Sequence, residues 1–261
     1  QAVEPSKALV CFETVEEVEG AVLVEGRRVT GPQARHHAIL VEGLKPATRH
    51  DFVVSPGELK GAFQTPPEGD GEVFFVVWGD SRTYFDRLAK IATLAAADRP
   101  DFTVHSGDLV DDGDVEEDWD LFFKAARPLL SAGALWPAMG NHEAGSKIYT
   151  DLFHLPEPER WYTFRWGPAQ FFVLDSNYEM RDQAAQHDWL KRELAASKAR
   201  FKFAMTHYPV VSGSYAGFSF GEEGREFAGW RSLFEEHKVT AVLQGHNHNY
   251  QRHERNGIVY I

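Results

Sequence analysis

From Val73 onward, short apolar runs alternate with longer runs that have the period of an amphipathic helix. The apolar runs have the length of β-strands and lie at Val73–Trp78, Phe102–His105, Leu135–Met139, Phe171–Leu174, Phe201–Met205 and Thr240–Leu243. The helical runs lie at Phe85–Ala97, Glu117–Leu130, Gln183–Ser197 and Arg225–His237, and Asp182 is a candidate N-cap for the third. Because strands that alternate with helices build layered sheets, this part of the chain predicts an α/β domain.

The first 67 residues follow a different pattern, without a helical period. Short strand-like runs with turn signals between them lie at Ala8–Glu13, Ala21–Glu25, His37–Val41, Asp51–Ser55 and Gly61–Gln64. A stretch rich in Pro and Gly follows at residues 65–71, and such stretches often separate domains. We therefore predict a small all-β domain at residues 1–67 and an α/β domain at residues 72–261. The chain ends on the strand-like run Ile258–Ile261, so we expect the natural protein to continue.

The charge of the chain limits the partners that it is expected to bind. Its formal net charge of -12 disfavours nucleic acid, because sequence-independent binding to DNA or RNA depends on clustered Lys and Arg. A small phosphorylated substrate remains compatible, since bound cations would reverse the local field. The longest apolar runs are far shorter than the roughly 20 residues that a membrane-spanning helix needs. The sequence predicts no transmembrane segment and gives no indication of the oligomeric state.

Five of the six predicted strands of the α/β domain are followed by residue types that bind metal ions. In chain order these residues are Asp80, Asp108, Asn141, His207, and the pair His246 and His248. In open α/β sheets, ligands bind at the carboxyl ends of the strands, so we expect these side chains to converge. A Gly precedes four of the five motifs, which is consistent with sharp turns that let backbone segments approach closely. The ordered set predicts a metal centre, although each dipeptide alone is ordinary turn chemistry.

On these residues the chain resembles the calcineurin-like metallophosphoesterases, especially purple acid phosphatase-like members with an N-terminal fibronectin type III-like domain. The matching motifs, in family order, are Gly79-Asp80, Gly107-Asp108, Gly140-Asn141-His142-Glu143, Thr206-His207 and Gly245-His246-Asn247-His248. The resemblance implies a two-sheet β-sandwich flanked by helices (αββα), preceded by a small all-β Ig/fibronectin-like domain. The segment Leu44–His50 resembles the turn into a late strand of fibronectin type III sandwiches, although His50 stands where that fold usually has Tyr.

The resemblance also implies ligands for two metal ions. It gives Asp80 and His248 to the first ion, Asn141, His207 and His246 to the second, and Asp108 to both. Imidazole and amide oxygen suit Fe, Mn or Zn better than Mg or Ca. Two such ions roughly 3.5 to 4 Å apart activate water and clamp phosphoryl oxygens. The implied function is hydrolysis of phosphate monoesters by in-line attack of a metal-bound hydroxide.

Two neighbouring residues have implied roles beside the ligands. His142 is implied to bind the phosphate and to protonate the leaving oxygen, and the alternative is a His that only hydrogen-bonds a ligand. Glu143 is expected to orient its neighbours, because side chains around metal-bound His usually do so.

Two positions depart from the family pattern, and both concern the first ion. Purple acid phosphatases have a Tyr ligand in the second motif, whereas Asp111 stands there in this chain. Most other members of the superfamily have a His two residues after the first Asp, whereas Arg82 stands there in this chain. Asp111 or Asp112 could replace the missing ligand, or Asp111 could be a solvated loop acid. Arg82 could face the substrate phosphate as a fork donor, or it could pair with nearby acids.

Several alternatives stay open on the sequence alone. Loop aromatics at residues 145–166 and 212–224 could line a pocket for the leaving group or could anchor these loops to the core; they are Tyr149, Trp161, Tyr162, Tyr215 and Phe218. A phosphodiesterase on the same scaffold is an alternative function. A non-catalytic cell-surface binding protein with a degraded metal site is another. The resemblance implies export from the cytoplasm, and any targeting signal would lie upstream of Gln1.

Overall fold

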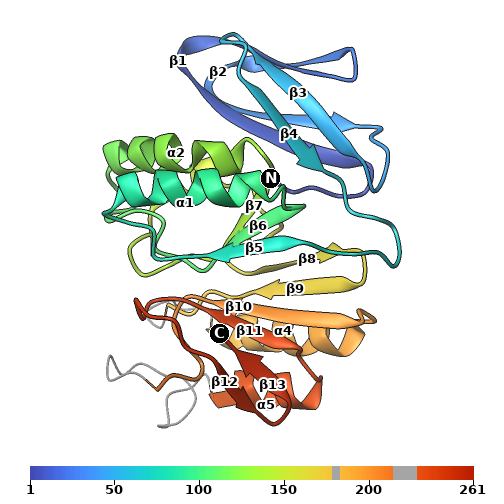
Figure 1. Ribbon diagram of the computed structural model, residues 1–261, viewed down its shortest axis with the longest axis vertical. Helices are drawn as coiled ribbons and strands as arrows, with labels where there is room; N and C mark the ends of the chain where they lie inside the picture. The colour runs from blue at the N-terminus through green and yellow to red at the C-terminus, as the bar shows by residue number, and fades with distance from the viewer. Residues whose placement is uncertain (178–182, 214–227) are drawn as a thin grey trace.

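The N-terminal part of the chain forms a four-stranded antiparallel sheet (Figure 1). The structure is a computed structural model that describes residues 1–177, 183–213 and 228–261. Its strands are β1 (Lys7–Val24), β2 (Arg27–Glu42), β3 (Arg49–Ser55) and β4 (Lys60–Gln64), in the order β2-β1-β3-β4. Glu25 and Gly26 connect β1 to β2, both with positive φ angles, of 49° and 76°. This backbone geometry belongs to the tight turns that match the twist of a β-hairpin.

The structure corrects the strand prediction for this region. The runs Ala8–Glu13 and Ala21–Glu25 were expected as separate strands, but both belong to the single strand β1. The pairing of β1 with β2 shifts register between Glu13 and Val18 and again between Glu19 and Ala21, so a local irregularity breaks the alternating pattern without ending the strand. Residues 1–67, all of them described, form one sheet, and the predicted fibronectin-like sandwich is not confirmed.

The α/β part contains two sheets that face each other. The first is parallel and has the order β5-β6-β7, with β5 at Phe75–Trp78, β6 at Phe102–His105 and β7 at Ala134–Pro137. The helices α1 (Phe85–Ala97) and α2 (Glu116–Leu130) cover its outer face (Figure 1). α2 forms because Trp119, Phe122, Ala126 and Leu129 fall on one buried face, while three acidic residues in its first turn stabilise the helix dipole.

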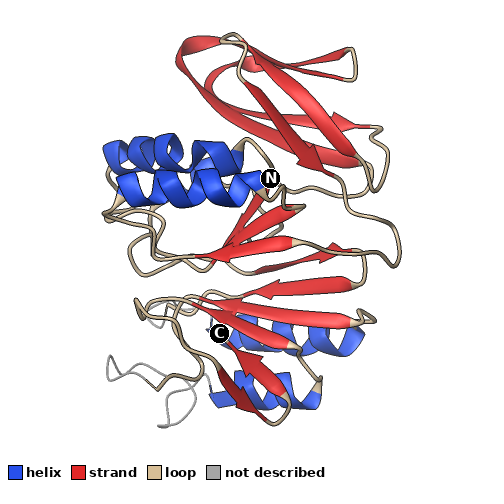
Figure 2. Cartoon of the chain, in the orientation of Figure 1, coloured by secondary structure: helices blue, strands red, loops and turns tan. Residues whose placement is uncertain are grey.

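The second sheet has six strands in the order β12-β13-β11-β10-β9-β8. Their bounds are β8 Tyr162–Trp166, β9 Ala169–Val173, β10 Phe201–Thr206, β11 Ala241–Gln244, β12 His253–Arg255 and β13 Ile258–Tyr260. The helices α4 (Gln183–Ala196) and α5 (Ala228–Glu236) lie on the outer side of this sheet (Figure 2). The αββα arrangement expected for this part of the chain is thus observed.

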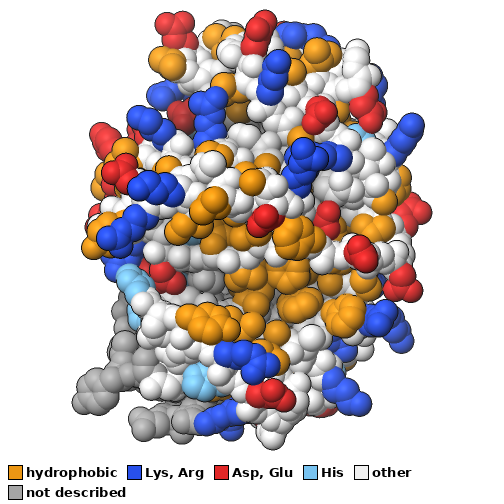
Figure 3. Space-filling model, in the orientation of Figure 1, with side chains coloured by type: hydrophobic (Ala, Val, Ile, Leu, Met, Phe, Trp, Pro, Cys, Tyr) orange, Lys and Arg blue, Asp and Glu red, His pale blue; other side chains and the backbone are white. Residues whose placement is uncertain are grey.

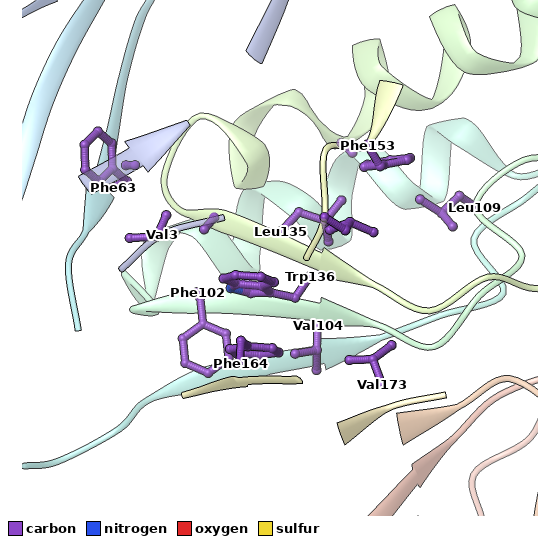
Figure 4. Close-up of a cluster of buried hydrophobic side chains, with 14 of the residues drawn as sticks. Val3, Phe63, Phe102, Val104, Leu109, Leu135, Trp136, Phe153, Phe164 and Val173 are labelled. Carbon is purple, nitrogen blue, oxygen red and sulfur yellow. The ribbon is translucent and has the colours of Figure 1, made fainter. Parts of the chain in front are cut away.

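Aromatic side chains fill the space between the two sheets (Figure 4). Phe164 stacks on Trp136 at 4.0 Å between ring centroids and on Phe171 at 4.7 Å. Phe102 from β6 meets Phe171 edge-on at 5.4 Å, so the core joins the first sheet to the second. Each fully buried side chain of this kind contributes roughly 1.5 to 3 kcal/mol of transfer free energy.

The N-terminal sheet lies against α2. The amide of Ala62 donates a hydrogen bond to the carbonyl of Ser131, at the end of that helix. The buried cluster between the two β-sheets also includes residues of β1, β3 and β4, so apolar packing is continuous from residues 1–67 into the α/β part. A cavity of about 310 Å³ lies at this junction, between Phe12 and Phe52 on one side and Phe123 on the other.

Strand β5 is an edge strand with exposed apolar side chains. It pairs only with β6 in the described part of the chain; Val77 in the strand is 42% exposed, and Phe74, directly before the strand, is 50% exposed. Hydrophobic side chains gather across the middle of the face shown in Figure 3. Among the helices that the structure describes, none has both the length and the apolar composition needed to cross a bilayer.

Three short elements were not predicted. They are α3 (Lys147–Leu152), β8 and β12. The first two lie in a segment that was expected to be a loop. Asp182, the candidate N-cap, lies outside the described residues.

Candidate metal centre

The predicted ligands lie at the carboxyl ends of five strands from both sheets. Asp80 follows β5, Asp108 follows β6 and Asn141 follows β7. The second sheet supplies His207 after β10, with His246 and His248 after β11. The close approach of the loops requires glycine, because a Cβ at Gly140 would lie 2.2 Å from an Asp108 carboxylate oxygen. The structure therefore brings all six residues to one end of the sandwich.

Four of these side chains form what we term the inner cluster: Asp108, Asn141, His207 and His246. The amide oxygen Oδ1 of Asn141 lies 2.9 Å from His207 Nε2 and 3.0 Å from His246 Nδ1. His207 Nε2 also lies 3.2 Å from Asp108 Oδ1 and 3.3 Å from His246 Nδ1. Asp108 and His207 are buried, and the other two side chains are partly buried.

The proton positions in the inner cluster leave a gap that a cation would fill. His207 Nδ1 donates to the carbonyl of Ser106 at 2.9 Å, so the neutral ring carries its proton there and Nε2 has only a lone pair. Burial lowers the pKa of His207 to about 4, which keeps the ring neutral. The lone pair of Nε2 therefore faces the oxygens of Asn141 and Asp108 without a proton between them.

The spacing of these atoms matches a shared ion. Ligand atoms that bind one ion at about 2.0 to 2.2 Å lie roughly 3.0 to 3.5 Å from one another in tetrahedral or octahedral geometry. Asp108, His207 and His246 also offer ligand atoms that all lie within 4.8 Å of one another. The inner cluster thus fits a metal ion by both distance and donor type.

Asp80, Asp108 and His248 form what we term the outer cluster, which also has ligand atoms within 4.8 Å of one another. His248 Nε2 lies 3.5 Å from Asp80 Oδ1, and the amide of His246 donates to both Asp80 oxygens at 3.0 Å. Burial and the nearby Asp108 carboxylate raise the pKa of Asp80 to about 7. Two crowded carboxylates of this kind suit a cation, but the His248 side chain is 56% exposed.

Three of the candidate ligands have an unusual backbone conformation. Asp80, Asp108 and His246 have positive φ angles of 49°, 57° and 68°. Non-glycine residues rarely adopt this region, and each costs of order 1 kcal/mol or more. Such conformations persist only where the surrounding structure imposes them, and these three are among twelve described non-glycine residues with positive φ.

Glu143 supports the backbone of two of the motifs. Its carboxylate is fully buried and accepts hydrogen bonds from the amides of Asp108, Val110 and Gly140, at 3.0 to 3.1 Å. Burial and the Asp108 charge raise its pKa to about 8, while the three amides act in the opposite direction. The structure agrees with the orienting role that the sequence suggested.

A second supporting group was missed at sequence level. Asn177 is buried, and its amide nitrogen donates to the carbonyls of Met139 at 3.4 Å and Gly140 at 3.3 Å, directly before Asn141. Asp175 accepts from that same nitrogen at 2.8 Å and from the Arg160 guanidinium at 2.7 Å. The only available signal was that this polar run follows β9, the one predicted strand whose end had no assigned residue.

His142 lies at the mouth of the centre. Its Nδ1 donates a short hydrogen bond to the carbonyl oxygen of Asp111, so Nε2 is the ring atom that remains free. Nε2 lies 3.8 Å from Asp108 Oδ2, and 24% of the side chain is exposed. The ring is therefore positioned to transfer a proton to or from a group bound beside Asp108.

The two departures from the family pattern contact each other. Arg82 Nη1 lies 2.6 Å from the Asp111 carboxylate, and Arg82 Nε lies 3.6 Å from Asp108 Oδ2. Asp111 belongs to neither of the metal-compatible groups found among the described residues. The oxygen Oδ1 of Asp112 accepts a hydrogen bond from the amide of Asp114, within the same loop.

The loop aromatics within the described residues are core anchors and do not line a pocket. Tyr149 and Tyr162 are 1% exposed, Trp161 is 8% exposed, and both tyrosine hydroxyls donate to the carbonyl of Pro137. The pocket interpretation is wrong for these three residues. Tyr215 and Phe218 lie outside the described residues.

The two facing sheets, with carboxylates and imidazoles gathered at one end, have the arrangement of a metallophosphoesterase. Residues 75–250 match the family described as calcineurin-like phosphoesterase, and the chain belongs to that family.

The chain is also similar in sequence to several purple acid phosphatases. "Probable inactive purple acid phosphatase 1" of Arabidopsis thaliana is 26% identical over 183 residues, which cover 59% of this chain and 29% of that protein. "Fe(3+)-Zn(2+) purple acid phosphatase 12" of the same plant is 22% identical over 250 residues, covering 84% and 52%. The chain therefore spans about half or less of the length of these relatives.

The fold is similar to that of purple acid phosphatase PPD1 from yellow lupin (Lupinus luteus) seeds. The TM-score is 0.80 at 17% sequence identity, and the match covers 100% of this chain and 62% of the other. At that identity the likeness concerns the fold alone.

Proposed function

We propose that this protein hydrolyses phosphate monoesters with a pair of metal ions bound at the inner and outer clusters. The observation that carries the proposal is the unprotonated Nε2 of His207, which faces Asn141 Oδ1 at 2.9 Å. That contact brings two acceptor atoms together, an arrangement that a shared cation would stabilise. Fe, Mn or Zn suits this donor set better than Mg or Ca.

The proposed ligands divide as the two clusters do. Asn141, His207 and His246 would hold one ion, Asp80 and His248 the other, and Asp108 would contribute to both. Oδ1 of Asp108 faces the inner cluster at 3.2 Å from His207, and Oδ2 faces outward toward His142 and Arg82. When bound, such an ion pair supplies Lewis-acid activation of water and clamps phosphoryl oxygens.

His142 is the proposed general acid. The carbonyl of Asp111 accepts from Nδ1 and fixes the ring, so in the imidazolium form Nε2 carries the proton that the leaving oxygen needs. The two tasks would then be separate, since the clusters would bind the phosphate and the imidazole would deliver the proton. We also propose that the physiological substrate is a small phosphorylated molecule and that the protein acts outside the cytoplasm.

The test measures metal content and turnover together. Protein purified without chelators is analysed by mass spectrometry for ions per chain, and hydrolysis of 4-nitrophenyl phosphate is followed with added Mn, Zn or Fe. We expect two ions per chain and turnover that a chelator abolishes. Two ions without turnover on this monoester or on bis(4-nitrophenyl) phosphate would instead support a non-catalytic binding role, and faster turnover of the diester would favour the phosphodiesterase.

A further inference from the structure

Arg82 occupies an unusual position at the mouth of the metal centre. It is two residues beyond Asp80, and the amides of Ser81 and Arg82 both donate to the carbonyl of Asp108, at 3.0 and 3.3 Å. These bonds fix the start of the side chain beside the candidate ligands. The side chain is 25% exposed, yet its Nε is buried and has no hydrogen-bond partner among the residues that the structure describes.

Asp111 connects Arg82 with His142 through two different parts of one residue. Its carboxylate accepts from Arg82 Nη1 at 2.6 Å, and its main-chain carbonyl accepts from His142 Nδ1. One loop residue therefore orients the guanidinium and the imidazole together. Oδ1 of Asp111 is held by the guanidinium, and Asp111 belongs to neither metal-compatible group among the described residues, which argues against Asp111 as a metal ligand.

The two oriented groups point at the same atom. Arg82 Nε and His142 Nε2 lie 3.6 and 3.8 Å from Asp108 Oδ2, which is the outward oxygen of the carboxylate shared by both clusters. Both distances exceed those of a good hydrogen bond, so the guanidinium and the His142 ring in its imidazolium form each keep a donor for another acceptor. A phosphate oxygen beside Asp108 Oδ2 would meet a guanidinium on one side and an imidazole on the other.

We propose that Arg82 is a substrate-binding residue that holds a non-bridging phosphate oxygen, and that Asp111 is its positioning residue. The inference rests on the proposed function, and it gives a physical reason for a preference for monoesters over diesters. Near neutral pH a monoester carries about 1.5 to 2 negative charges, whereas a diester carries one, so an additional fixed cation favours the monoester. The guanidinium would thus neutralise part of the phosphate charge beside the outer cluster.

The test compares Arg82→Ala, Arg82→Lys and Asp111→Asn with the intact protein. Asp111→Asn is informative because it removes the charge that holds Arg82 but keeps the main-chain carbonyl that holds His142. Arg87→Ala is the matched control, since Arg87 is an exposed arginine on α1. Circular dichroism confirms that each variant is folded.

Three measurements are made on each variant. They are the dissociation constant for inorganic phosphate by calorimetry, the ions per chain by mass spectrometry, and KM and kcat for 4-nitrophenyl phosphate and for bis(4-nitrophenyl) phosphate. For Arg82→Ala we expect phosphate binding to weaken about 10- to 100-fold, with KM for the monoester rising in parallel. Metal content should not change, and the diester should be affected less. Arg82→Lys and Asp111→Asn should show smaller changes in the same direction.

Two results would overturn the inference. One is loss of an ion in Asp111→Asn with phosphate affinity intact, which would make Asp111 a metal ligand. The other is unchanged phosphate affinity in Arg82→Ala. Because phosphate binding is measured without turnover, failure of the proposed function would appear separately, as absent hydrolysis in a protein that still loses phosphate binding on Arg82→Ala.

Discussion

The two clusters of the metal centre share Asp108 but differ in how well the protein supports them. The inner cluster has a buried imidazole with a fixed tautomer, and Glu143 and Asn177 hold the surrounding backbone. The outer cluster ends in a half-exposed His248, and an arginine–aspartate pair stands where a further ligand would be expected. Metal affinity depends on supporting hydrogen bonds as well as on ligands, so the two sites are expected to bind their ions unequally.

The largest effect is expected when the inner cluster loses a ligand. In His207→Ala, we expect loss of at least one ion per chain and a fall in kcat/KM of about a thousandfold or more, because Lewis-acid stabilisation is worth several kcal/mol. Mass spectrometry and 4-nitrophenyl phosphate hydrolysis provide the measurements. His36→Ala, at an exposed histidine of the N-terminal sheet, is the control. Two ions per chain and full turnover in His207→Ala would show that His207 is not a ligand of the inner ion.

Removal of the proposed general acid should separate proton transfer from metal binding. In His142→Ala, kcat should fall roughly 10²- to 10⁴-fold while both ions remain. The loss should be larger for an alkyl phosphate than for 4-nitrophenyl phosphate, because a poor leaving group depends more on protonation. Equal losses on both substrates would indicate that His142 only supports a neighbouring ligand.

Loss of the supporting amide should weaken the inner ion selectively. In Asn177→Ala, the carbonyls of Met139 and Gly140 lose a common donor, and affinity for the inner ion should fall about 10- to 100-fold. Metal titration followed by calorimetry tests this, with Gln33→Ala as a control at an exposed amide. If the weaker of the two ions were the one affected, Asn177 would not serve the inner cluster.

The smallest effect concerns the unaltered protein. Dialysis against increasing dipicolinate should remove one ion per chain at a chelator concentration at least about tenfold lower than the other, a difference of 1.4 kcal/mol or more in binding free energy. His248→Ala should then lack the ion that leaves first. Simultaneous release of both ions would show that the exposed His248 does not weaken its site.

The ligand motifs could be predicted because each one is local. Asp80, Asp108 and Asn141 each follow a short apolar run directly, and the helices between them have a clear period. β8 was missed because its identity depends on antiparallel pairing with β9, which the segment itself does not reveal. The pairing of Arg82 with Asp111 joins residues 29 positions apart, so the sequence left both of its interpretations open.

Whether a supporting residue could be predicted also depended on how local its contacts are. Asn177 acts on carbonyls 37 and 38 positions earlier in the chain, and no local pattern marks such a contact. Glu143 was easier to interpret because it lies within a recognised motif. Contacts between distant loops determine how the ligands are held, whereas the strand pattern determines where the ligands lie along the chain.

The contact between the N-terminal sheet and α2 has a practical consequence for anyone seeking a minimal catalytic fragment. Phe123 and Leu130 of α2 line a cavity together with Phe12 and Phe52 of the N-terminal sheet, and all four pack against the same buried cluster. A fragment that begins at residue 72 would present these side chains to water, where they would promote self-association. A shortened version would therefore need polar replacements on the outer face of α2 before its solubility could match that of the longer chain.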